Sequence, residues 1–192
     1  MTILRTLSYA ALLALMGVGA ASCINPPEYS DTPEISFKSL TSVPFDSIKD
    51  GDPAGSFNRV VVTISFKDGD GDLGLSDEDT NPPYARLNPD GSLNKYNNNY
   101  FLTLQEKNSD GTFSDFVLPD PGLNYNSRYP RLEPDSQGDR KQPLKGDLSF
   151  KQTFGVGSPP FVRGRTVRFR VYIVDRALHE SNEVFTDPIT VQ

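Results

Sequence analysis

The segment 166–175, TVRFRVYIVD, alternates apolar and polar side chains more regularly than any other part of the chain. Val167, Phe169, Val171 and Ile173 share one face, whereas two arginines and a tyrosine share the other. A period of two is the repeat of a β-strand, in which successive side chains point to opposite faces. The segment therefore predicts a strand with one face in a core and the other in solvent.

Other segments share the length and the patterning of strands: 34–40, 59–66, 99–107, 111–118, 147–154 and 182–191. No window shows an apolar stripe of helical period and useful length. About seven strands separated by turn signals predict an all-β fold, an antiparallel immunoglobulin-like β-sandwich. The polar stretches 76–99 and 119–145 are too long for plain hairpins. We expect these two long loop insertions to pack over one side or one end of the sandwich.

The first 22 residues have the layout of a secretory signal peptide: one basic residue, a short apolar stretch and then small residues. Cys23 follows directly and is the only cysteine, so the chain cannot form an internal disulfide. The residues before Cys23 resemble a bacterial lipoprotein cleavage box. The resemblance implies cleavage before Cys23 and lipidation of its sulfur and its new amino terminus. Several acyl chains on one residue would anchor the protein stably to a membrane.

Residues 23–33 are Pro-rich and predict a lipidated tether, and 34–192 predict one immunoglobulin-like domain. Removal of 1–22 leaves 170 residues and changes the formal net charge from −6 to −7. This acidic balance argues against a basic surface that binds nucleic acid or anionic lipid.

Six carboxylates crowd into the stretch 65–80, SFKDGDGDLGLSDEDT. Asp68, Asp70 and Asp72 stand at alternate positions, and oxygen ligands without nearby His or Cys suit Ca²⁺. The spacing mimics the start of an EF-hand loop, but Leu73 stands where that loop needs glycine, and a strand precedes it. The alternative is a bare solvated turn, because Asp-Gly pairs are good turn formers. We interpret SDEDT, 76–80, as a solvated extension that lends at most one oxygen.

Asp175 is the fourth predicted ligand. In an immunoglobulin-like sandwich, the connections after the second strand and between the sixth and seventh strands emerge at the same end. The first of these connections begins with the acidic stretch, and the second is 175–182. We therefore expect Asp175 to approach Asp68, Asp70 and Asp72, and a structural calcium ion to fix one loop against the other.

Three segments, ISFKDGDGDLGL, LKGDLSFKQTF and VRFRVYIVDRALHESNEVFTDPITV, together resemble a group of uncharacterised lipoproteins of Bacteroidota. The resemblance implies a lipid-anchored protein of the bacterial outer membrane with an immunoglobulin-like sandwich, and it implies no activity. The export cue of surface lipoproteins in that phylum is an acidic stretch after the cysteine. Only Glu28 and Asp31 stand there, so the periplasmic and surface faces both stay open. The triplet 46–48, DSI, resembles that phylum's O-glycosylation site, with Ser47 as acceptor.

Catalysis has little support in the sequence. A Ser-His-Asp arrangement needs a histidine, and the only one, His179, is interpreted as an exposed loop residue. Acids are plentiful, but nothing selects a carboxylate pair for a hydrolase. We therefore expect a non-catalytic accessory or interaction protein whose partner is an envelope protein or a glycan.

The alternative function is a carbohydrate- or peptide-binding adhesion module. The two long loops hold four tyrosines among Asn and Arg: Tyr96, Tyr100, Tyr125 and Tyr129. Aromatic rings stack on sugars, and amides supply hydrogen bonds. The same tyrosines could instead pack the long loops onto the sandwich, which is the interpretation that we favour.

Overall fold

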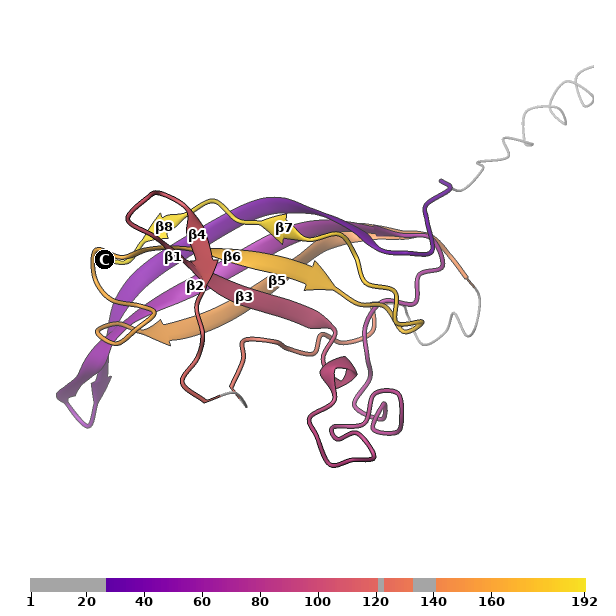
Figure 1. Ribbon diagram of the computed structural model, residues 1–192, viewed down its shortest axis with the longest axis horizontal. Helices are drawn as coiled ribbons and strands as arrows, with labels where there is room; N and C mark the ends of the chain where they lie inside the picture. Colours follow the sequence, from indigo (N-terminus) through magenta and orange to yellow (C-terminus); the bar gives the residue numbers. More distant parts are fainter. Residues whose placement is uncertain (1–26, 121–122, 133–140) are drawn as a thin grey trace, which may run out of the picture.

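The computed structural model describes residues 27–120, 123–132 and 141–192 (Figure 1). The predicted signal peptide and Cys23 lie outside these residues. Within the described ranges, we find no helix that is both long enough and apolar enough to cross a membrane.

Two antiparallel sheets face each other (Figure 1). The first has the order β1-β2-β5 and is made of β1 (Glu34–Lys49), β2 (Asp52–Asp68) and β5 (Leu144–Gly155). The second has the order β4-β3-β6-β7 and is made of β3 (Tyr100–Lys107), β4 (Phe113–Asp115), β6 (Thr166–Ile173) and β7 (Val184–Phe185). A short β8 (Ile189–Thr190) also pairs with β6, and a 3₁₀ turn, η2 (Lys95–Asn97), precedes β3. The all-β sandwich is confirmed, and the finer immunoglobulin-like class stays a prediction.

The apolar faces of β2 and β6 form the centre of the core. The following side chains are at most 1 % exposed: Val60, Val62, Ile64, Val167, Phe169, Val171 and Ile173. Full burial of such a side chain contributes roughly 1.5–3 kcal/mol. The inward face predicted for β6 is therefore correct, and this core holds the ends of β2 and β6 in fixed positions.

The β1–β2 hairpin is much longer than its two predicted strands and projects beyond the second sheet (Figure 1). Its turn is Asp50–Gly51, with φ values of 55° and 92°, as a two-residue hairpin turn requires. Phe45 stacks on Phe57 with ring centroids 5.6 Å apart, and Arg59 lies over the Phe45 ring. These cross-strand contacts hold a segment whose own apolar pattern is weak. Ser47 lies in this arm, and its glycosylation stays a prediction.

The described parts of both long insertions pack against the sandwich, as expected. In the first, the Tyr84 hydroxyl donates a hydrogen bond to the Arg176 carbonyl, beyond the end of β6. In the second, Ser127 pairs with Tyr100, on the part of the β3 edge that β4 does not cover. Both insertions therefore bring side chains to the end where β2 and β6 finish.

Candidate metal centre

Three carboxylates meet at one end of the sandwich. Asp68 is the last residue of β2, Asp72 follows in the next loop, and Asp175 comes two residues after β6. One carboxylate oxygen of each lies within 4.8 Å of the other two. Ligands on opposite sides of one Ca²⁺ lie about 4.6–5.2 Å apart, since each is about 2.3–2.6 Å from the ion. These three residues, here called the acidic cluster, therefore have the spacing of a single-ion site.

Asp68 is fully buried and incompletely hydrogen-bonded. Its Oδ2 accepts a hydrogen bond from the Gly71 amide at 2.9 Å, whereas its buried Oδ1 has no partner. An unpartnered buried oxygen is costly, and it is rare in folded proteins. This atom is therefore suited to ligate a cation.

The predicted ligand Asp70 lies beside the acidic cluster. It is 6 % exposed, and its Oδ2 lies 3.2 Å from the Lys141 ammonium. Its Oδ1 is also buried without a partner. Asp70 thus adds negative charge and a second unpartnered oxygen, although it is not one of the three carboxylates that meet.

Backbone amides of the loop after β6 orient the other two carboxylates. The Ala177 amide donates to Asp72 Oδ2 at 3.0 Å, and the His179 amide donates to Asp175 Oδ1 at 2.7 Å. The His179 ring nitrogen Nδ1 lies 2.8 Å from Asp175 Oδ2. The loop therefore fixes carboxylates from both sheets in one place.

Burial and mutual repulsion raise the pKa values of the carboxyl groups in the acidic cluster. Burial, followed by the charges of Asp70, Asp72 and Asp175, raises the pKa of Asp68 to about 7. Burial, followed by the charges of Asp175 and Asp70, raises the pKa of Asp72 to about 6. Burial also raises the pKa of Asp175, against the hydrogen bonds from His179. These carboxyl groups resist ionisation on their own, and a bound cation would stabilise their ionised form.

The Tyr129 side chain comes from the second long insertion and lies within electrostatic reach of the acidic cluster. It is 7 % exposed, and its buried hydroxyl has no hydrogen-bond partner of normal geometry. Burial, followed by the charges of Asp68, Asp175 and Asp72, raises the Tyr129 pKa. Asn99 positions the residue by accepting from the Tyr129 amide and donating to its carbonyl.

Leu73 explains why this loop is not an EF-hand. Its side chain is fully buried in the core, where the EF-hand pattern places a glycine. The next residue, Gly74, has a φ of 96°, and a Cβ there would lie 2.2 Å from the Pro130 carbonyl oxygen. The loop therefore turns inward at Leu73 and packs on the second insertion.

The predicted solvated extension is only partly solvated. Asp77 and Glu78 are exposed, as expected. Asp79 instead forms a two-pronged ion pair with the Arg176 guanidinium and accepts from the Ser76 amide at 2.7 Å. The hydrogen bond from Arg176 is the main cause that lowers the Asp79 pKa to about 2. The ion-pair partner of the Arg176 guanidinium is therefore Asp79.

The predicted ligand-binding tyrosines occupy different environments. Tyr100 is 1 % exposed and stacks on Phe150 in the core, and Tyr129 is also buried, so neither ring offers a face to a ligand in solvent. Tyr125 is half-buried and packs edge-on against Phe154. The packing interpretation fits these three. Tyr96 lies near a polar surface hollow on the outer face of β3 and β6, and Tyr125 lines a second hollow beside β3.

The sequence pattern did not place four residues beside the acidic cluster: His179, Lys141, Asn99 and Tyr129. His179 shares its loop with Asp175, so the topology that placed Asp175 could have placed it too. Nothing local marks Lys141 or Asn99, because they come from other connections and meet the cluster only in the folded chain.

Comparisons of this chain with protein-family models, with curated proteins and with solved structures found no match. The resemblance to lipoproteins of Bacteroidota therefore stays a prediction. The function of the chain has to be inferred from the geometry of the described residues.

Proposed function

We propose that this protein is a non-catalytic, lipid-anchored envelope protein in which the acidic cluster binds one structural calcium ion. The observation that carries the calcium site is the buried, unpartnered Oδ1 of Asp68 within a group of three converging carboxylates. All the side-chain donors are hard oxygens, which suit Ca²⁺ better than a transition metal.

The ion would join the two sheets at this end of the sandwich. Asp68 belongs to β2 in the first sheet, and Asp175 follows β6 in the second. Because both carboxylates would ligate the ion, its charge would offset their repulsion and hold the two loops against each other. The wider accessory or interaction role rests on the predicted anchor at Cys23 and on the predicted outer-membrane location, with the membrane face left open.

Thermal unfolding of the purified full chain in millimolar CaCl₂ and in EDTA tests the calcium site. Binding to the folded state alone would add about 1–3 kcal/mol at roughly ten to a hundred times Kd. In a chain of this size, each kcal/mol raises Tm by about 2–4 °C. Asp68→Asn with Asp72→Asn should abolish the rise. An unchanged Tm in the unsubstituted chain would overturn the proposal.

The anchor has its own test. Mass spectrometry of the mature protein from its native host should find an amino-terminal Cys23 that carries acyl chains, and Cys23→Ala should leave the protein unlipidated. A mature chain that begins elsewhere would overturn the anchor without affecting the calcium site.

A surface hollow of about 290 Å³ favours a second candidate function, carbohydrate or peptide binding. It lies on the outer face of β3 and β6, where the Tyr172 ring stacks on Phe101 at 4.5 Å. Thr103, Asn126, Arg170, Glu180 and Glu183 also line it. Tyr96 stands beside it, with its hydroxyl 3.5 Å from Glu180. An aromatic floor with polar groups around it suits a sugar ring.

A glycan array probed with the purified chain tests this candidate. Binding should be lost in Tyr172→Ala and kept in Tyr125→Ala, because Tyr125 packs elsewhere. A silent array would leave the structural calcium protein as the only proposal.

A further inference from the structure

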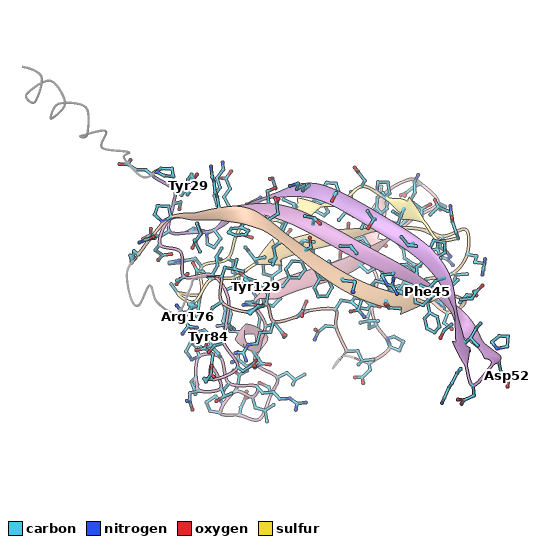
Figure 2. All side chains as sticks on the ribbon, turned by 180° about the vertical axis from the view of Figure 1, so that it is seen from behind. Tyr29, Phe45, Asp52, Tyr84, Tyr129 and Arg176 are labelled. Carbon is cyan, nitrogen blue, oxygen red and sulfur yellow. The ribbon has the colours of Figure 1, made fainter. Side chains whose placement is uncertain are left out.

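The chain just before β1 lies directly on the loop 68–72, here called the acidic loop. The amide of Gly69, which stands between Asp68 and Asp70, donates a hydrogen bond to the Ser30 carbonyl at 2.8 Å. Figure 2 shows Tyr29 at the same end of the molecule as Arg176, which directly follows Asp175. The backbone of the acidic loop is therefore hydrogen-bonded to the segment 29–31, here called the docked segment.

Gly69 is required by this close approach. A Cβ at Gly69 would lie 2.3 Å from the Tyr29 carbonyl oxygen and 2.8 Å from the Ser30 carbonyl carbon and oxygen. Backbone atoms cannot turn aside as a flexible side chain can. Any larger residue at position 69 would therefore separate the docked segment from the loop.

Side chains around the acidic cluster make the remaining contacts. The Lys141 ammonium lies 3.3 Å from Asp31 Oδ2 and 3.2 Å from Asp70 Oδ2, so it bridges the segment and the loop. The His179 ring binds Asp175, and the nearby Asp31 backbone contributes to the raised pKa of that ring. The docked segment is thus bonded to the loop after β2 and lies close to the loop after β6.

The strand after the docked segment is held separately. The Asn182 side chain accepts from the Ile35 amide at 2.8 Å and donates to the Ile35 carbonyl at 2.9 Å. In contrast, Ser30 and Asp31 of the docked segment are exposed, and Tyr29 is half-buried. The docked segment can therefore leave the loop while β1 stays in its sheet.

We propose that calcium in the acidic cluster holds the docked segment on the loop and that loss of the ion releases it. This inference rests on the proposed calcium site. Without the ion, the carboxylates repel one another, the loop from Asp68 to Asp72 opens, and the Gly69 amide moves away from Ser30. Linkage is reciprocal, so docking of the segment tightens calcium binding by the same factor. Calcium thereby sets whether the folded domain begins before or after the docked segment.

Chymotrypsin provides a direct measurement, because it cleaves after aromatic residues and Tyr29 lies within the docked segment. The full chain, purified in detergent, is digested in millimolar CaCl₂ or in EDTA, and the products are identified by mass spectrometry. We expect cleavage after Tyr29 to be at least about tenfold slower in calcium, in proportion to closure of the segment. Cleavage after Phe169, which is fully buried in β6, serves as the reference for unfolding of the whole domain.

Gly69→Ala should undock the segment and spare every carboxylate. We expect fast cleavage after Tyr29 in both solutions, a retained rise of Tm with calcium, and calcium binding weakened on the order of fivefold. Lys141→Met removes the bridge without altering the backbone and should accelerate cleavage in calcium. Lys151→Met, on the exposed face of β5, is the matched control and should change neither measurement.

The outcomes separate the two proposals. Equal cleavage with and without calcium, in a chain whose Tm does rise with calcium, overturns the docking inference alone. A Tm that calcium does not change overturns the calcium site and this inference with it. If Gly69→Ala does not fold, Lys141→Met decides: faster cleavage in calcium supports docking, and an unchanged rate overturns it.

Discussion

The tetrapeptide KDGD occurs twice, at 49–52 and at 67–70, and its two copies lie at opposite ends of the molecule (Figure 2). In the first copy, Asp50 and Asp52 are exposed, and a Cβ at the central glycine would meet nothing within 4 Å. In the second copy, Asp68 and Asp70 are buried. The same four residues form a solvated turn at one end and part of a buried carboxylate group at the other.

The difference comes from the chain that continues after each copy and from the segments that approach it. After the first copy, the chain pairs at once with the strand that it has just left. After the second, Leu73 enters the core, and Asp175 arrives from the other sheet. Burial of a short acidic motif is therefore decided by its non-local neighbours, which its own residues do not encode.

The largest contrast should come from one apolar side chain at each end. Leu73→Ala removes a fully buried side chain, and such truncations cost about 2–5 kcal/mol. Ile48→Ala alters a side chain that is 71 % exposed, beside the first copy, and surface changes stay within about 0.5 kcal/mol. Urea unfolding in EDTA measures both. Equal losses would show that the acidic loop is not tied to the core by Leu73.

Replacement of the aspartates by asparagine should raise the free energy of unfolding at the second copy and leave it nearly unchanged at the first. In EDTA near neutral pH, Asp68→Asn with Asp72→Asn should raise stability by roughly 1–3 kcal/mol, because it removes two crowded charges, of which that of Asp68 is fully buried. Asp50→Asn with Asp52→Asn should change it by less than about 0.5 kcal/mol, because those residues are exposed. Thermal melts compare the two double variants. If the first pair lost stability in EDTA, the carboxylates would already be satisfied without an ion.

Stability should also depend on pH through the second copy. The folded pKa values of Asp68 and Asp72, about 7 and about 6, lie above the value of 3.8 for an unperturbed carboxyl group. The folded chain therefore binds these protons more tightly. The stability that they give is complete below that value and is lost as pH rises through 6 and 7.

We accordingly expect the Tm in EDTA to fall by several degrees between about pH 5 and pH 8, and calcium to restore it at the upper end. Melts across this range make the measurement. Asp68→Asn with Asp72→Asn should flatten the profile, and Asp50→Asn with Asp52→Asn should leave it unchanged. A profile that stays the same in the first double variant would contradict the assignment.

The smallest contrast concerns polar contacts near each copy. Asp79→Asn breaks the part-buried pair with Arg176 and should cost about 1–2 kcal/mol near neutral pH. The depressed Asp79 pKa makes this stability complete above its usual value and lost as pH falls through about 2, so the variant and the parent should converge in strong acid. Ser56→Ala breaks an exposed hydrogen bond to Asp46 and should cost less than about 0.5 kcal/mol. Melts at several pH values distinguish the two.

The sequence was most informative where a pattern repeats along one strand. The alternation in β6 predicted its inward face, because a half-buried strand must place every second side chain in the core. From strand order alone, the meeting of Asp175 with Asp68 and Asp72 could also be predicted. Topology in this case substituted for a local motif.

Features that depend on pairing with distant chain were not predictable in the same way. The outer half of the β1–β2 hairpin is stabilised by its partner strand and by the Phe45–Phe57 stack, so its own residues look like a loop. Asp79 is indistinguishable from its acidic neighbours until Arg176 arrives from the other end of the sequence. The contact of Gly69 with Ser30 joins two backbones and leaves no trace in side-chain patterning.

The long antiparallel ladder between β1 and β2 also has a mechanical consequence. The chain enters β1 beside the acidic loop, whereas its last residue, Gln192, lies beside Phe45 near the opposite end. A pull between these two points would run along the strands and load the ladder in shear, so that many hydrogen bonds would share the force at once. The two hydrogen bonds between the Asn182 side chain and the Ile35 backbone lie near the start of β1, where the force would first be applied. A domain held in this way would resist tension through its longest strands.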